Sequence, residues 1–359
     1  MSDQYLFPHR RDFIRAASIG CAAAASAVLD TQARDAAAPV RIGSGPWTYT
    51  LDESWGTLPA GMKYGFGCAI VLDGQERVYV TSRSTSPCVA VFNRDGKLLE
   101  TWSKDFTEKV GFDPKQYAAT AHGLYWSKEP DGEYFYWTEN VAGGRNAPKI
   151  GARVYKTDLK GKVLYTLGPG VKTTSDSDAF DFVSPTDVAV SPNGDIYVVD
   201  GYGSQLVHRF DKNFKLVKTI GGKGKENGKF NTCHGVWVSS LNKEPELYIA
   251  DRANDRIEIY SLDLEYKRTL PDFRKPCCFY QHAGHLYVPE LDARVSIVDA
   301  NDKTVASIGD GKGIAAKEIA KHPDKFATPH ALTVDSRGDL YVIEWLDFGR
   351  PRKFRHTPA

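Results

Sequence analysis

The chain has 359 residues, of which 42% are hydrophobic and 25% are charged, and its formal net charge is +1 at pH 7. That length and composition fit one large or two medium globular domains. Because the sequence contains no basic run or stripe, nucleic-acid binding has no electrostatic support. Aromatic residues make up 12% of the chain, which favours a sheet-rich fold.

The first 38 residues have the composition of a targeting segment. Arg10–Ile14 is a twin-arginine pattern, and an Ala-rich, weakly apolar run follows from Ala16 to Leu29. That run is too short and too rich in alanine to span a bilayer. We therefore expect a twin-arginine signal peptide over residues 1–38, export to the periplasm, no membrane span, and one folded domain over residues 39–359. The alternative is a disordered Arg/Ala tail.

The cysteines leave the disulfide pattern open. Beyond the targeting segment the sequence has Cys68, Cys88, Cys233, Cys277 and Cys278. An odd number leaves at least one thiol unpaired, although the periplasm permits disulfides. A Cys68–Cys88 bridge and a vicinal Cys277–Cys278 link both fit, and spacing does not choose between them. The chain has no CxxC pair, which argues against a structural cysteine-rich zinc site.

One unit recurs along the rest of the chain. It is an alternating apolar strand, a turn, a second strand that ends in an acidic or polar residue, and two further strands. The third copy shows it best, with a hairpin over Asp187–Asp200 that turns at Asn193-Gly194, followed by strands over Gln205–Phe210 and Lys215–Ile220. Asn-Gly between alternating apolar runs is a strong hairpin signal.

The copies predict a closed ring. Their starts lie near Gly67, His122, Thr186, His234, Cys277 and His330. Short strands with a repeat of about 45 residues indicate an all-β, six-bladed β-propeller. The last copy lacks a fourth strand, and Trp47–Leu51 has the pattern to supply it, which would close the ring and remove open edges.

Three segments interrupt the repeats. Lys312–Lys321 is the best helix candidate, Phe106–Tyr117 is an insertion before the second blade, and the Gly/Lys-rich Gly221–Asn231 is expected to be a mobile connector. Such insertions can wall one mouth of a propeller channel.

Three histidines occupy one repeat position in every second copy. They are His122, His234 and His330, and the copies between them hold Thr186 and Cys277 at that position. In a six-bladed ring these histidines would lie on alternate blades, about 120° apart around the axis. Three converging imidazoles with an open fourth position describe a catalytic zinc site. The alternative is that each histidine forms a hydrogen bond across the channel without metal.

Further polar residues follow the second strands. Arg83 and Arg252 both lie on loops after a second strand, which line the same face of a propeller as the histidine-bearing strand entrances. Arg252 could instead pair with Asp251 or Asp255 as a surface ion pair of little energetic value. Tyr202 could simply cap a turn.

The sequence resembles the NHL-repeat propellers over its mature length, and more closely the peptidyl-α-hydroxyglycine α-amidating lyase family. Four elements carry the likeness: the three histidines, Asp200-Gly201-Tyr202, Ala250-Asp251-Arg252 and Ser82-Arg83. The resemblance implies that His122, His234 and His330 bind zinc and that Tyr202, Arg252 and Arg83 are catalytic or substrate-facing.

The resemblance also implies a reaction. A carbinolamide places its hydroxyl on the zinc, Tyr202 as phenolate removes the proton, and C–N cleavage releases an amide and an aldehyde such as glyoxylate. Arg252 would stabilise developing negative charge, and Arg83 would grip a substrate carboxylate in a bidentate way. The expected partner is a small-molecule or peptide α-hydroxy-amide, and the expected state is a monomer.

The sequence departs from the family pattern at two positions. Ala331 stands where the family has an acidic ligand of a structural calcium, although Asp187 in another blade could substitute, so calcium is expected at most as a structural ion. Gly203 stands where the family has a disulfide cysteine. Cys277 would face the channel near the metal and could alter the ligand set.

Two other functions fit the same fold. Six-bladed propellers also hold metal-dependent lactonases, whose carboxylate and Asn ligands contrast with the histidine-rich axis expected here. The non-enzymatic alternative is an NHL-type platform that binds a protein or glycan and holds no metal.

Overall fold

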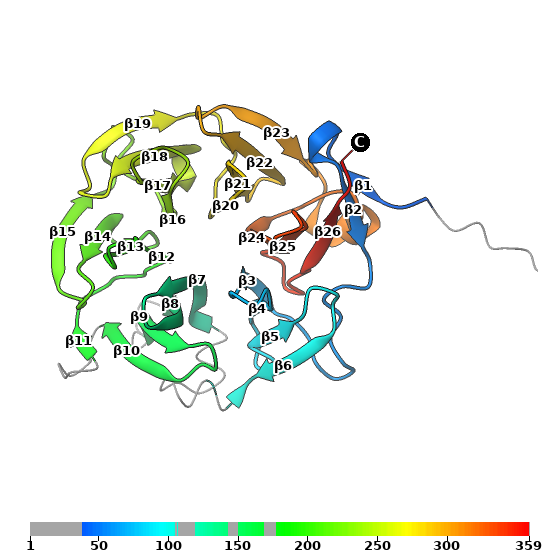
Figure 1. Ribbon diagram of the computed structural model, residues 1–359, viewed down its shortest axis with the longest axis horizontal. Coiled ribbons are helices and arrows are strands. Elements are labelled where there is room, and N and C mark those ends of the chain that lie inside the picture. The colour runs from blue at the N-terminus through cyan, green and yellow to red at the C-terminus, as the bar shows by residue number, and fades with distance from the viewer. Residues whose placement is uncertain (1–37, 105, 107–118, 143–149, 169–176, 359) are drawn as a thin grey trace, which may run out of the picture. The chain divides into compact units, whose positions relative to one another are not determined.

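The computed structural model describes residues 38–104, 106, 119–142, 150–168 and 177–358. Residues Pro39–Ala359 form one compact unit, in which the described strands make six sheets arranged in a ring (Figure 1). The predicted all-β six-bladed propeller is confirmed. The signal-peptide prediction falls on residues outside the described part, apart from Ala38, and so does the Phe106–Tyr117 insertion, apart from Phe106. No helix within the described part is long and apolar enough to cross a membrane.

Each blade is built from strands that follow one another outward from the axis. The first two blades contain β3 (Phe66–Leu72), β4 (Val78–Arg83), β5 (Val89–Phe92), β6 (Leu98–Trp102), β7 (Ala121–Glu129), β8 (Gly132–Ala142), β9 (Ile150–Asp158), β10 (Val163–Gly168) and β11 (Ser177–Ala179). The third and fourth contain β12 (Asp187–Val190), β13 (Ile196–Asp200), β14 (Leu206–Phe210), β15 (Leu216–Gly221), β16 (Cys233–Ser239), β17 (Glu246–Asp251), β18 (Arg256–Ser261) and β19 (Tyr266–Leu270).

The last two blades complete the ring. They contain β20 (Tyr280–His282), β21 (His285–Glu290), β22 (Arg294–Asp299), β23 (Thr304–Ile308), β24 (Pro329–Val334), β25 (Leu340–Glu344) and β26 (Arg352–His356), with β1 (Arg41–Ile42) and β2 (Tyr49–Asp52). The described 3₁₀ helices are η1 (Gly45–Trp47), η2 (Arg252–Asn254) and η3 (Ala316–Lys321). The helix predicted over Lys312–Lys321 is therefore a shorter 3₁₀ helix.

The third blade shows why the repeat folds as it does. Gly194 adopts a φ of 88° in the predicted turn, and Ser191 N donates to Asp195 O at 2.9 Å, which joins β12 to β13. All five residues of β13 are buried because neighbouring blades cover both of its faces, whereas β15 at the outer edge is largely exposed. Burial on two faces explains the unbroken apolar run of the second strand.

Aromatic side chains fill the space between blades. A tyrosine is the second residue of β4 and of β13, and the third residue of β17. Each of these tyrosine rings lies in the core, and its hydroxyl donates to a polar partner. Tyr79 in β4 packs against Phe135 in β8, with ring centroids 4.7 Å apart. Such cross-blade contacts bury apolar surface at each interface and hold the ring together.

The two ends of the described chain meet in the sixth sheet. β2 pairs antiparallel with β26, with Leu51 opposite Phe354, and the strand order is β1-β2-β26-β25-β24. The strand expected over Trp47–Leu51 thus begins two residues later, because Trp47 belongs to η1. The pairing gives β26 an outer neighbour and so covers its edge.

The described cysteines are all free thiols, and four of the five are buried. Both candidate disulfides, Cys68–Cys88 and Cys277–Cys278, are therefore absent from the described residues. The thiols act as small apolar groups in the blade interfaces.

Candidate active site

The three predicted histidines converge on the propeller axis. One ligand nitrogen from each of His122, His234 and His330 lies within 4.8 Å of the others, and all three side chains are buried. They come from the inner strands β7, β16 and β24 of alternate blades, as the repeat spacing predicted. In the first blade Cys68 occupies the position that the histidines occupy in their blades. The strand registers show this, because Gly67, the residue before Cys68, pairs with Ser82 just as Pro329, the residue before His330, pairs with Glu344.

A local irregularity in each inner strand aims the histidines at the axis. The register shifts between Ala121 and Leu124, between Cys233 and Val236, and between Pro329 and Ala331. A bulge of this kind bends the strand and redirects a side chain. After His122 and His234 the next residue is a glycine, which lets the neighbouring blade approach, since a Cβ on Gly235 would lie 2.2 Å from Cys277 O.

The intervening blades fix the orientation of every imidazole. His122 Nδ1 lies 2.6 Å from Thr186 O, His234 Nδ1 lies 2.7 Å from Cys277 O, and His330 Nδ1 lies 2.7 Å from Cys68 O. A carbonyl oxygen only accepts, so each Nδ1 carries the proton and each Nε2 keeps its lone pair. Alternate blades therefore supply the imidazoles, and the blades between them supply the carbonyls that set the tautomer.

The histidines are held neutral. Burial, together with the positive charges of Arg252 and Arg83, lowers the pKa of His330 to about 3. Burial likewise holds the pKa values of His122 and His234 well below the ordinary value. Neutral imidazoles are the form that binds metal.

The donor set fits a metal ion. His330 Nε2 is buried and has no hydrogen-bond partner among the described residues. Three Nε2 lone pairs that face one another repel, and a cation shared among them would remove that repulsion. Histidines that bind a metal usually donate their other ring N–H to an acceptor such as a backbone carbonyl, which fixes the orientation of the ring. The described residues can therefore bind a metal at this point.

Tyr202 and Arg252 lie at one face of the histidine cluster. Tyr202 Oη is 3.2 Å from His122 Nε2 and 3.1 Å from His234 Nε2, and Arg252 Nη1 donates to it at 3.1 Å. Tyr202 is 39% exposed as a residue, whereas its hydroxyl contacts the two buried histidines. Burial raises the pKa of Tyr202 and outweighs the opposing effect of Arg252 and Arg83. Without a cation at the histidines the phenol therefore stays protonated at neutral pH; the phenolate expected from the sequence was expected beside a bound metal and stays a prediction.

Arg83 lies on the same side, held by groups that the sequence analysis did not single out. Its Nε donates to Ala121 O at 3.0 Å and its Nη2 donates to Asn140 Oδ1 at 2.8 Å. The guanidinium carbon lies 4.9 Å from the ring centroid of Trp345, which in turn lies 5.0 Å from the His330 ring. Trp345 and Asn140 share one repeat position with Arg83 and Arg252, because each comes directly after the second-strand residue that pairs with the start of the inner strand. That shared position could have revealed them.

In three blades an acidic residue at the end of the second strand accepts a hydrogen bond from the segment that leads into an inner strand. Asp200 accepts from Val183 N at 2.8 Å, Asp251 accepts from Asn231 N at 2.7 Å, and Glu344 accepts from Ala327 N at 2.6 Å. Each of these carboxylates thus holds the segment that leads into an inner strand. Each carboxylate also stands one or two residues before a site residue in the sequence. The acidic strand ends seen in the repeats are the structural reason that the site residues meet.

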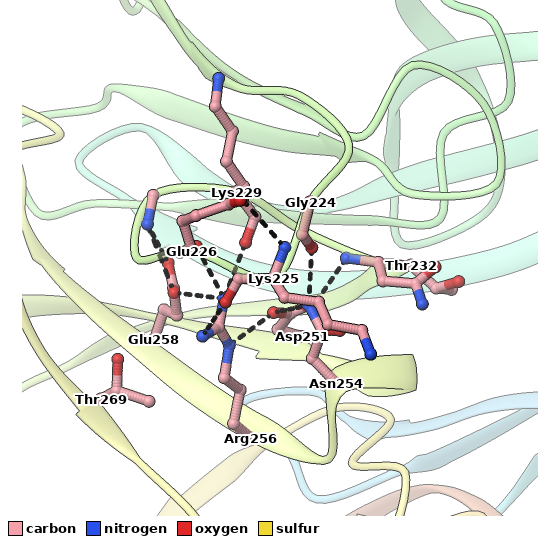
Figure 2. A network of polar contacts seen from close by, with 12 residues as sticks. Gly224, Lys225, Glu226, Lys229, Thr232, Asp251, Asn254, Arg256, Glu258 and Thr269 are labelled. Atoms are coloured by element: carbon pink, nitrogen blue, oxygen red, sulfur yellow. Dashed lines mark hydrogen bonds and ion pairs between the residues drawn. The ribbon is translucent and has the colours of Figure 1, made fainter.

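The segment Gly221–Asn231, predicted to be a mobile connector, is held by a polar network (Figure 2). Arg256 donates to three of its backbone carbonyls, those of Lys225 (2.7 Å), Glu226 (3.0 Å) and Lys229 (2.9 Å). Arg256 Nε also donates to Asp251 Oδ2 at 2.7 Å. The network holds the chain immediately before His234 in place, so hydrogen bonds oppose the mobility expected from the composition of this segment.

A cavity of about 70 Å³ lies beside the three histidines and is lined mainly by residues of the inner strands. Tyr202 and Arg252 do not line it. Its lining is mostly apolar, and Asp187 is the one carboxylate among its described residues. Burial raises the pKa of Asp187 to about 7. Calcium takes six to eight oxygen ligands, and the adjacent Ala331 offers no side-chain oxygen for it. The structural calcium ion expected from the resemblance stays a prediction. Cys277 is buried at the axis but does not belong to the ligand group.

Comparisons with known proteins agree with the repeat and the fold. The NHL repeat family model matches residues 182–210. The chain is 28% identical over 308 residues to human NHL repeat-containing protein 3, covering 82% of this chain and 81% of that protein. It is 30% identical over 186 residues to a probable peptidyl-alpha-hydroxyglycine alpha-amidating lyase of Caenorhabditis elegans, covering 51% of this chain and 46% of that protein. The chain is an NHL-repeat propeller that resembles the amidating lyases.

Solved structures agree on the fold of this NHL propeller. A gluconolactonase from Xanthomonas campestris superposes with a TM-score of 0.55 at 14% identity, covering 88% of this chain and 94% of that one. At that identity the likeness concerns the fold alone. The distant relatives include enzymes, and the match to the worm lyase spans about half of each chain, so the activity of this NHL propeller has to be argued from its own site.

Proposed function

We propose that this chain is an exported, zinc-dependent lyase that cleaves the C–N bond of an α-hydroxy-amide to an amide and an aldehyde such as glyoxylate. The observation that carries the proposal is the set of three Nδ1–carbonyl bonds, which turns three Nε2 lone pairs toward one another beside Tyr202 Oη. The likeness to a probable amidating lyase supports the same chemistry.

His122, His234 and His330 would hold the zinc through Nε2. Three protein ligands with an open fourth position are typical of catalytic rather than structural zinc. When bound, zinc supplies a Lewis acid that lowers the pKa of a substrate hydroxyl. The carbonyls of Thr186, Cys277 and Cys68 keep the three rings oriented for that role.

Tyr202 would carry the proton. Its Oη takes the proton of the substrate hydroxyl, a C=O bond forms at the carbinol carbon as the C–N bond breaks, and the same proton passes to the departing amide nitrogen. The step consumes no water, and its atoms balance within the substrate. A divalent cation at the neighbouring imidazoles would offset the burial that raises the pKa of Tyr202.

The arginines would act on negative charge. Arg252 donates to Tyr202 Oη at 3.1 Å, which favours the phenolate form and charge that develops beside it. Arg83 has its Nε and one Nη2 hydrogen bond committed to Ala121 O and Asn140 Oδ1, so a substrate carboxylate would approach its Nη1 end. A side-on grip through Nε is taken up by these bonds, so the bidentate grip expected from the sequence would use the Nη1 and Nη2 end of the guanidinium.

The test combines metal content with activity. Natively purified protein and a His234→Ala variant would be analysed by elemental mass spectrometry and assayed for glyoxylate release from an N-acyl-α-hydroxyglycine. We expect about one zinc per chain in the parent protein, loss of zinc in the variant, and activity that follows the zinc. Bound zinc without glyoxylate release, but with lactone hydrolysis, would favour the lactonase. No transition metal in chelator-free preparations would favour the binding platform.

The export proposal has a separate test. Twin-arginine export requires the paired arginines, so Arg10→Lys combined with Arg11→Lys should retain the protein inside the cell. Unchanged export of that variant, measured by cell fractionation, would contradict the proposed route.

A further inference from the structure

The Tyr202 hydroxyl is oriented by atoms that a metal ion would use. Its partners are His122 Nε2, His234 Nε2 and Arg252 Nη1. Each Nε2 has one lone pair, which can accept from the phenol or bind a cation but not both. The phenol has a single proton, so it donates to one of these two nitrogens at a time. In the metal-bound enzyme Tyr202 therefore loses that hydrogen bond and keeps the one from Arg252 Nη1, and the residue is 39% exposed. Another part of the protein has to hold the tyrosine in place.

Gln205 is the side chain placed to do so. Its Nε2 lies 2.7 Å from Gly201 O and 3.4 Å from Gly203 O, the two carbonyls that flank Tyr202 in the chain. Both hydrogen bonds run from the amide nitrogen to carbonyl oxygens, so the Gln205 amide closes the turn around Tyr202. The glycines leave little room for the turn to shift, since a Cβ on Gly201 would lie 1.8 Å from Cys233 O.

The other end of the same amide holds the neighbouring blade. Gln205 Oε1 accepts from Thr232 N, two residues before His234. Thr232 O in turn accepts from Arg252 N at 2.9 Å. One amide thus joins the turn that carries Tyr202 to the segment that positions His234 and Arg252. Figure 2 shows Thr232 beside the Asp251–Arg256 network that holds this segment.

The backbone at both ends of this link is unusual. Gln205 has a φ of 62° and Thr232 a φ of 66°. A β-branched residue rarely adopts a left-handed conformation, and such strain persists only where surrounding bonds enforce it. The Gln205 amide supplies one of those bonds.

We propose that Gln205 is a positioning residue that keeps Tyr202 aligned with His234 and Arg252 once the histidines bind metal. This inference rests on the proposed function. Because Gln205 bonds to backbone atoms around the site and not to substrate, its loss should lower turnover while the metal stays bound. Misplacement of a catalytic group by about an ångström can cost about 100-fold in rate.

The test uses two substitutions of similar size. Gln205→Glu keeps an acceptor for Thr232 N but places a carboxylate oxygen against Gly201 O and Gly203 O, and Gln205→Met removes both contacts. The matched control is Gln281→Glu, because Gln281 Oε1 accepts from Ser240 N at 2.9 Å and so joins two blades at a distance from the histidines. Each protein is loaded with zinc, its metal content is measured, and kcat and KM are determined with an N-acyl-α-hydroxyglycine.

We expect both Gln205 variants to retain zinc, to lose about 10- to 100-fold in kcat with KM little changed, and to lose nothing further in a Tyr202→Phe background. That non-additivity separates positioning of Tyr202 from a general loss of stability. The control should match the parent protein. Turnover of the Gln205 variants within twofold of the parent, loss of zinc, or full additivity with Tyr202→Phe would each overturn the proposal.

Hydrogen–deuterium exchange tests the link without activity. In the metal-bound Gln205 variants, peptides covering residues 200–204 and 231–235 should exchange faster together, whereas Gln281→Glu should leave both unchanged. Faster exchange in neither segment, or in one alone, would contradict a cross-blade link. If the parent protein fails to release glyoxylate, the proposed function fails, and the exchange result still decides whether Gln205 couples the two segments.

Discussion

The metal affinity of this site should depend on pH much less than that of ordinary histidines. Protons compete with metal for Nε2, so affinity falls as pH drops through the histidine pKa. Burial and the neighbouring arginines lower all three pKa values, that of His330 to about 3. The loss of affinity is therefore displaced to lower pH, and the lowered pKa values keep the ligands available in mildly acidic solution.

The expected difference is large. For three independent histidines with a pKa of about 6.5, the fraction with all three neutral falls about 6-fold from pH 7.5 to 6.5 and about 1,000-fold from pH 7.5 to 5.5. With the lowered values, protonation of His330 is negligible throughout this range, and the zinc dissociation constant should rise far less than for ordinary histidines.

The assay is zinc competition against a chromophoric chelator at pH 7.5, 6.5 and 5.5, corrected for protonation of the chelator. The matched variant is Arg83→Met, which removes a charge that lowers the pKa of His122 and His330 and should make the dependence steeper. A dissociation constant that rises several-hundred-fold between pH 7.5 and 5.5 in the parent protein would refute the reasoning, because it would require ordinary, exposed histidines.

Three other changes test separate parts of the structure. Gly235→Ala would place a Cβ 2.2 Å from Cys277 O, so it should displace the carbonyl that orients His234 and weaken zinc binding about 10- to 100-fold in the competition assay; unchanged affinity would contradict the role of that bond. Tyr202→Phe should retain zinc and lower kcat about 100- to 10,000-fold, and near-normal turnover would exclude Tyr202 as the base. Glu344→Gln removes the buried partner of Arg350 (2.8 Å) and Arg352 (3.1 Å) and should lower the free energy of unfolding by about 3–5 kcal/mol in urea denaturation; a loss below about 1 kcal/mol would show that the pair is screened.

Repeat spacing alone was sufficient to predict the ring and the meeting of the three histidines. A repeat whose strands alternate apolar residues can bury them only by packing blade on blade, so equivalent positions recur around one axis. His122, His234 and His330 were identifiable for that reason. The predicted hairpin at Gly194 followed from local backbone preference, which needs no long-range contact.

The tertiary structure decided what the repeat pattern does not encode. The carbonyls of Thr186, Cys277 and Cys68 that set the histidine tautomers come from neighbouring blades, and backbone atoms leave no mark in residue type. The thiols stay free, and Gly221–Asn231 is fixed by Arg256 from a later strand, although its composition suggested mobility. Strand periodicity determines which residues face the axis, whereas their protonation, partners and rigidity depend on atoms brought together only by closing the ring.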